Sequence, residues 1–341
     1  YQITAKRVGG GTSTASITIS VDICTGGKSL ITLVARMDGY PKEGCYTLYS
    51  GKGTSGQVVQ SVPGFKVAYG LNYGDFCVAH GLYTLELKDA NSDGWVNPAG
   101  YYLTVDVGQM IVEMGQMPNK VASVTTLFSS YLPFQIEYDD WKFYNIGDEP
   151  AENWMAVDFD DSAWQTVKAA AMGNHNGVTA YVRREVNIPA LEDYHVLNVR
   201  VKYTGGLAVY FNGRKVARFN LAETFDASTE AKAPHDASAF AKFHIVLPTA
   251  GAVAGKNVIA FEIHRATSDS AVVFDATGVF GVNDCSVTVD SFAAIDASPV
   301  SGCRKEDLLD LNPTTFGYIS NTAGSYLAWT VENLEGSKWN S

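Results

Sequence analysis

Apolar residues alternate with polar residues along much of the chain, and this period of two predicts β-strands. Residues 15–23 and 81–88 place every second side chain on one face. These apolar positions are Ile17, Ile19, Val21, Ile23, Tyr83, Leu85 and Leu87. Similar short runs occur at residues 29–37, 45–50, 57–61, 100–107 and 110–114. No segment up to residue 117 has a sustained helical period, so this region is predicted to be an antiparallel sandwich.

A second unit with longer strands follows a polar connector. Near its end Ile259, Phe261 and Ile263 alternate inward, which leaves Glu262 and His264 on the opposite face. Residues 211–216, "FNGRKV", predict a hairpin because Asn-Gly favours the tight turn. The sequence therefore predicts an all-β chain of tandem antiparallel sandwiches. We expect an N-terminal sandwich over residues 1–117, a linker over 118–137, a second sandwich over 138–284 and an incomplete third unit over 285–341.

The composition limits the classes of partner and the cellular setting. Of the 341 residues, 18% are charged, against about 25% in typical soluble domains. Polar uncharged residues replace them, as is typical of secreted β proteins. The net charge of −11 would repel a phosphate backbone, so nucleic acid is not an expected partner. No apolar run is long enough for a membrane helix. The first residue is Tyr1, which suggests either a removed leader or an internal piece of a longer chain.

Five cysteines allow two interpretations. They are Cys24, Cys45, Cys77, Cys285 and Cys303. They form no C-x-x-C pair and no zinc-like spacing with histidine. They could be buried thiols of a cytosolic protein, but the β-rich polar composition favours disulfides in an oxidising, extracellular setting. At most one pair closes within residues 1–117, and the odd thiol suggests an intermolecular link or a partner elsewhere.

The second unit resembles a known module. Its landmarks are "WKFYNIGDEPAENWMAVDFDDSAW", "TAYVRREVNIP", "YTGGLAVYFNGRKVARFNL" and "NVIAFEIHRATSDSAVVFDATGVFG", in this order. The series resembles a galactose-binding-like jelly-roll module, which is common in secreted and surface proteins. It is also similar to the non-catalytic N-terminal sandwich of many glycoside hydrolases. The resemblance implies the fold but not the ligand, since one fold serves many functions.

The flanking units carry shorter resemblances. "LLDLNPTTFGYISNTAGSYLAWTVENLEG" resembles the first half of a discoidin (coagulation factor 5/8 C-type) module. The D-x-x-x-D-G-W run at residues 89–95 resembles a module of bacterial and protist surface proteins. Together these resemblances imply a multi-module extracellular chain.

The run "DANSDGW" has two interpretations. Asp89, Asn91 and Asp93, followed by Gly94, reproduce the first half of an EF-hand calcium loop. A glycine stands where that loop needs a glutamate, and strands flank the run, so an EF-hand is excluded. The three oxygen-bearing side chains could still hold calcium in a β-loop. Alternatively, Asp89 and Asn91 bond to their own backbone, Gly94 is left-handed and Trp95 packs in the core.

Other motifs are explained by structure alone. Residues 51–56 match G-x-G-x-x-G, but a strand follows instead of a helix, so a hairpin is predicted. The acidic pairs at 139–140 and 160–161 could supply an acid and a base for glycoside hydrolysis. Adjacent residues rarely oppose each other across a substrate. We therefore expect residues 160–161 to form a turn beside buried Phe159 and Trp164, and expect no catalysis.

Sugar recognition needs exposed aromatic rings beside amides or carboxylates. One member of the Tyr101–Tyr102 pair must point outward, because side chains alternate along a strand. Tyr101, Asn174, His175 and Asn176 are the predicted ligand-binding residues, the last three in a polar loop at a sandwich end. Exposed tyrosines also serve protein contacts.

Three functions remain from the sequence. The first is a non-catalytic structural or adhesive protein, part of a longer extracellular chain that self-assembles into a surface coat or filament. The second is a lectin-like protein that binds glycans. The third is the accessory region of a secreted glycoside hydrolase. The expected partners are other copies, other extracellular proteins or glycans, with calcium as a possible cofactor.

Overall fold

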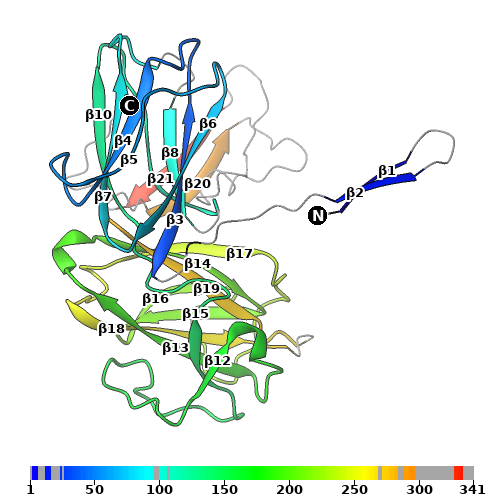
Figure 1. Ribbon diagram of the computed structural model, residues 1–341. Helices are drawn as coiled ribbons and strands as arrows, with labels where there is room; N and C mark the ends of the chain where they lie inside the picture. The colour runs from blue at the N-terminus through cyan, green and yellow to red at the C-terminus, as the bar shows by residue number, and fades with distance from the viewer. Residues whose placement is uncertain are drawn as a thin grey trace.

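The computed structural model describes residues 2–6, 12–16, 24, 27–95, 100–105, 108–267, 271–282, 288–295 and 326–332. Antiparallel sheets dominate it, so the predicted all-β class is confirmed. In Figure 1 a blue-to-cyan sandwich lies above a green-to-yellow one. Helix in the described residues is limited to two 3-10 turns, η1 (Ala169–Ala171) and η2 (Leu191–Asp193). No helix in this part of the chain could cross a membrane.

Two predicted regions can be followed only in part. The expected strand at residues 17–23 and most of the expected third unit lie outside the described residues. At the two ends the structure describes only the backbones of two hairpin-like pairs. These pairs are β1 (Gln2–Lys6) with β2 (Thr12–Ser16), and β20 (Thr288–Ile295) with β21 (Tyr326–Glu332).

The first sandwich consists of two four-stranded sheets. One sheet has the order β6 (Leu71–Ala79), β3 (Lys28–Arg36), β8 (Gly100–Val105) and β9 (Met110–Gly115). The other has the order β10 (Ser123–Ser129), β7 (Leu82–Asp89), β4 (Gly44–Ser50) and β5 (Val58–Val62). The predicted alternation in β7 is confirmed, since Tyr83, Leu85 and Leu87 are all buried. Residues 51–57 join β4 to β5, so the G-x-G-x-x-G run is the predicted hairpin.

The second sandwich packs a six-stranded sheet on a three-stranded one. The first has the order β12 (Gln165–Lys168), β11 (Asp140–Tyr144), β13 (Thr179–Ile188), β18 (Gly255–His264), β15 (Gly206–Phe211) and β16 (Arg214–Phe219). The second has the order β17 (Phe240–Val246), β14 (Val196–Tyr203) and β19 (Phe274–Gly281). The Asn-Gly hairpin is confirmed between β15 and β16, where Asn212 and Gly213 have φ of 50° and 80°.

Strand β18 is buried on both faces. Ile259, Phe261 and Ile263 point into the inter-sheet core, as predicted. On the opposite face His264 is also fully buried. A second apolar cluster covers part of that face of the sheet, and it includes Trp154 and Trp164 from the segment between β11 and β12. This segment, residues 145–164, therefore forms a third layer over part of the six-stranded sheet, and we call it the covering segment.

The expected linker at residues 118–137 contains core structure and needs correction. Residues 123–129 form β10 and pair along β7 from Ser123 to Ser129. Phe128 is fully buried in the first core, and Phe134, only six residues later, is fully buried in the second. Burial of one such ring stabilises each core by about 2–3 kcal/mol. The connector therefore joins the two sandwiches through their cores.

Aromatic stacking also fixes the connector to the second sandwich. The ring of Tyr131 lies 5.3 Å from that of Phe280 and 6.3 Å from that of Tyr194. At the rim, Lys52 Nζ lies 2.5 Å from Asp193 Oδ1 across the two sandwiches.

Within the described residues, the cysteines agree with the disulfide interpretation, because one pair is bonded and one thiol is left over. Cys24 is bonded to Cys77 on β6, and Cys45 is a free, partly buried thiol. Cys285 and Cys303 lie outside the described residues. The bridge fixes the chain before β3 to the solvent-facing side of β6.

We expect loss of the Cys24–Cys77 bridge to lower the free energy of unfolding by about 2–4 kcal/mol, because it closes a long loop in the unfolded chain. Chemical denaturation of Cys77→Ser measures this effect. The matched control is Cys45→Ser, which removes a free thiol and should change stability little. Equal stability of Cys77→Ser and the wild type would contradict the expectation.

Candidate functional site

The "DANSDGW" turn is built around a buried carboxylate. Asp89 ends β7 and is 4% exposed. Its Oδ1 accepts the Asn91 N–H at 3.1 Å and its Oδ2 accepts the Gly94 N–H at 2.6 Å. Ser92 and Gly94 have positive φ, and Trp95 packs edge-on against another core ring. Asp89 thus makes the backbone bonds that the sequence suggests, whereas Asn91 does not.

Two of the three predicted metal ligands lie together, with a third carboxylate that the sequence did not indicate. Oxygen atoms of Glu43, Asp89 and Asp93 all lie within 4.8 Å of one another. Asn91 instead donates its amide N–H to Glu43 Oε1 at 2.6 Å. Partial burial raises the pKa of Glu43, and the neighbouring Asp93, Asp89 and Asp38 add to that rise. Oxygen ligands of this kind suit calcium, and a bound cation would relieve their repulsion.

An aromatic and apolar row crosses the solvent-facing side of the β6–β3–β8–β9 sheet. Tyr73 pairs with Val34, Val34 pairs with Tyr102, and Tyr102 pairs with Met114. Paired residues in a ladder share one face, so all four side chains lie on the same side of the sheet. Tyr73 is 66% exposed and Met114 65% exposed. We call Tyr73, Tyr102 and Met114 the tyrosine row.

The two tyrosines of this row lie on either side of the middle strand. Val34 lies between them and is only 5% exposed. Burial raises the pKa of the Tyr102 hydroxyl, and the neighbouring Tyr73 adds to that rise. The two side chains thus flank Val34 on one face of the middle strand.

The predicted ligand residue Tyr101 needs correction. It is 7% exposed and belongs to the first core, where its ring lies over Gly115. Alternation along β8 places it with Leu103 and sends Tyr102 outward. The outward member of the pair is thus Tyr102, and Tyr101 cannot offer a ring face to a ligand.

The predicted loop residues Asn174, His175 and Asn176 lie at an end of the second sandwich, apart from the tyrosine row on the first. Asn174 and Asn176 are exposed and His175 is half-buried. The Asn174 carbonyl accepts an amide N–H of Asn145 at 2.8 Å, and the Asn176 N–H donates to Asn145 Oδ1 at 3.0 Å. Asn145 therefore fixes the loop to the end of β11.

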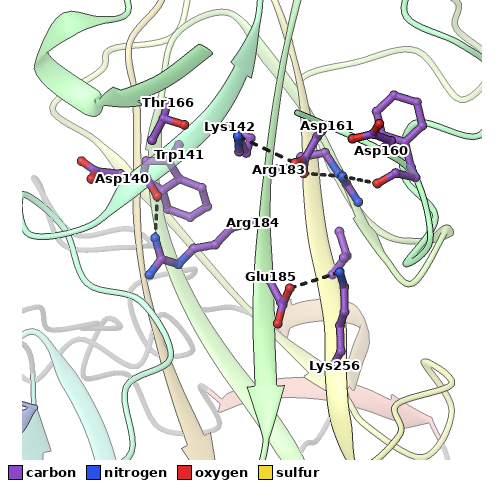
Figure 2. Close-up of a pocket in the computed structure, with 12 residues that line it drawn as sticks. Asp140, Trp141, Lys142, Asp160, Asp161, Thr166, Arg183, Arg184, Glu185 and Lys256 are labelled. Carbon is purple, nitrogen blue, oxygen red and sulfur yellow. Dashed lines mark hydrogen bonds and ion pairs between the residues drawn. The ribbon is translucent and has the colours of Figure 1, made fainter. Parts of the chain in front are cut away.

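A charged groove of 560 Å³ lies on the six-stranded sheet beside the covering segment, as Figure 2 shows. Arg183 on β13 is 2% exposed and forms an ion pair with Asp161. Its guanidinium also donates to the carbonyls of Phe159 at 3.2 Å and Ala156 at 2.8 Å. Arg183 therefore fastens the covering segment to the sheet.

The other charges at or beside this groove are also matched. The pairs are Lys142–Asp161, Lys168–Asp140, Arg184–Asp139 and Lys256–Glu185, with N···O distances of 3.8, 3.1, 2.6 and 3.2 Å. Asp160 accepts the Ser162 N–H at 3.0 Å, and the hydrogen bonds from Ser162 lower its pKa. A general acid of a glycosidase needs a raised pKa instead. The acidic pairs thus serve ion pairing and turn formation in this structure.

The residues that the sequence interpretation missed are Glu43, Tyr73 and Met114. Strand β6 was not predicted, because Asn72, Gly74 and Asp75 interrupt its apolar pattern. The sequence signal for this strand is the spacing of two between the apolar residues Phe76 and Val78, which are both buried.

Comparisons with known proteins show no family. No family model matches the chain, and no curated protein sequence matches it. A calcium-binding mutant of Bacteroides uniformis beta-glucuronidase 2 is 15% identical over 48% of this chain, with a TM-score of 0.29. The chain spans only 20% of that enzyme. The apo lectin of Pleurotus ostreatus is 13% identical over 82% of this chain and 71% of its own, with a TM-score of 0.25. Scores this low carry no argument about ligand or activity.

We expect Arg183→Met to lower the free energy of unfolding by about 3 kcal/mol, because it leaves two carbonyls without their buried donor and leaves Asp161 with Lys142 alone. The matched control is Lys256→Met, which breaks the exposed pair with Glu185 and should cost at most about 1 kcal/mol. Chemical denaturation measures both. Equal effects of the two substitutions would show that Arg183 does not fasten the covering segment.

Proposed function

We propose that this chain is a non-catalytic, carbohydrate-binding part of an extracellular protein. The observation that carries the proposal is the tyrosine row on the β6–β3–β8–β9 sheet. Sugar rings present apolar C–H faces that pack on aromatic side chains, and Tyr73 offers its ring to solvent. Asp75 and Thr32 lie in register beside the row and are hydrogen-bonded to each other, and the second carboxylate oxygen of Asp75 can accept from a sugar hydroxyl group.

Two observations support the extracellular and non-catalytic parts of the proposal. The Cys24–Cys77 bridge suits an oxidising compartment. The carboxylates at the charged groove are held in ion pairs and in a turn. Such a module would fit either a free-standing lectin or the accessory region of a secreted glycoside hydrolase.

Affinity electrophoresis against soluble polysaccharides tests the glycan proposal. We expect Tyr73→Ala to weaken binding about tenfold, because loss of one ring contact of about 1.4 kcal/mol corresponds to that factor. The matched control is Tyr138→Ala, which removes a tyrosine that is 51% exposed outside the row. Equal loss of binding in both variants would contradict the assignment of the row.

A structural or adhesive role is the second proposal, and the exposure of Met114 favours it. A sheet face with solvent-facing apolar side chains could also pair two copies of the chain. Sedimentation velocity separates the two proposals. A concentration-dependent dimer that Met114→Ala dissociates, together with no binding to any polysaccharide, would replace the glycan proposal by self-association.

We also propose that Glu43, Asp89 and Asp93 bind calcium. Calcium should raise the melting temperature of the wild type, because a ligand that binds only the folded state stabilises it. Asp93→Asn should abolish this rise, whereas the control Asp140→Asn, in the other sandwich, should keep it. A wild type whose melting temperature is the same in calcium and in chelator would leave the turn as a purely structural feature.

A further inference from the structure

The spacing of the tyrosine row matches a long ligand better than a small one. Tyr73 lies on β6 and Tyr102 on β8, with β3 between them. Adjacent strands are about 4.8 Å apart, so the two tyrosine positions are about 10 Å apart. Met114 on β9 extends the row by one more strand. The row therefore runs across the strands and spans the whole width of this sheet.

Polar groups line both sides of the row. On one side, Thr32 Oγ1 donates to Asp75 Oδ1 at 2.7 Å. On the other side Arg36 is exposed and pairs in register with Leu71. Thr32 and Arg36 each lie two residues from Val34 on β3, so they share its face of the sheet. An occupant of the row would find hydrogen-bonding groups along both edges.

The charges at the row favour an uncharged occupant. Arg36 and Asp75 have opposite signs and flank the row on its two sides. The whole chain carries a net charge of −11, which repels polyanions. A strongly anionic glycan is therefore disfavoured, and a neutral one is compatible with both edges.

We propose that this face binds an extended, uncharged polysaccharide whose chain crosses the strands, with separate sugar units packed on Tyr73 and on Tyr102. This inference rests on the proposed glycan-binding function and specifies its substrate class. A site for a single terminal sugar needs concave walls that enclose it. The row places its side chains in one line across a sheet face, which suits the side of a long chain.

Isothermal titration calorimetry with neutral oligosaccharides of two to six units tests the proposal. The probes are the cello-, xylo-, manno- and laminari-oligosaccharide series. In the series that binds, we expect affinity to rise at least tenfold from the disaccharide to the hexasaccharide, since only the longer chain reaches both rings. Tyr102→Ala should remove this dependence on length. Tyr102→Phe should retain it, because the ring remains and only the hydroxyl is lost.

The outcomes separate this inference from the function on which it rests. Equal affinity for disaccharide and hexasaccharide would overturn the extended-chain inference but leave glycan binding intact. If the protein binds polygalacturonate, which is anionic, and binds none of the neutral chains, the proposal of an uncharged ligand is overturned. Failure of the folded wild type to bind any neutral or acidic glycan would overturn both proposals. Circular dichroism of each variant confirms that it is folded.

Discussion

The register of the β6–β3–β8–β9 sheet is the constraint on which the candidate site depends. A slip of one residue would move Tyr73 from solvent to the core and bring Phe76 out. The core holds the register, because Phe76 and its ladder partner Ile31 are both buried. The Cys24–Cys77 bridge adds a covalent link on the solvent-facing side of β6. The tyrosine row is thus positioned by interactions on both faces of the sheet.

The two sandwiches meet at a junction where neighbouring residues enter different cores. Phe128 and Phe134 belong to different cores although they are only six positions apart in the chain. On β19, Val279 packs with the first core and Phe280 with the second, so adjacent residues also bridge the two. The charged groove acts within the second sandwich, where its buried arginine secures the segment between β11 and β12 to the sheet.

Local chemistry made part of the structure predictable from the sequence. The Asn212–Gly213 hairpin, the alternation in β7 and the backbone bonds of Asp89 each depend on a few neighbouring residues. The tyrosine row was not predictable, because its members come from three strands and meet only through pairing. Glu43 reaches Asp89 for the same reason. Tyr101 was chosen in place of Tyr102 because the sequence does not show which side of β8 faces the core. Residues 118–137 were taken for a linker because the polar residues of β10 hide the apolar side of that strand.

Methyl and aromatic NMR of the folded chain, titrated with a neutral hexasaccharide that it binds, tests the tyrosine row most directly. If the row binds the polysaccharide, the Met114 methyl group and the ring resonances of Tyr73 and Tyr102 shift together, with one affinity. The resonances of Asn174 and Asn176, at the end of the second sandwich, then stay in place. Shifts confined to that loop, with the tyrosine row unchanged, would contradict binding at the row.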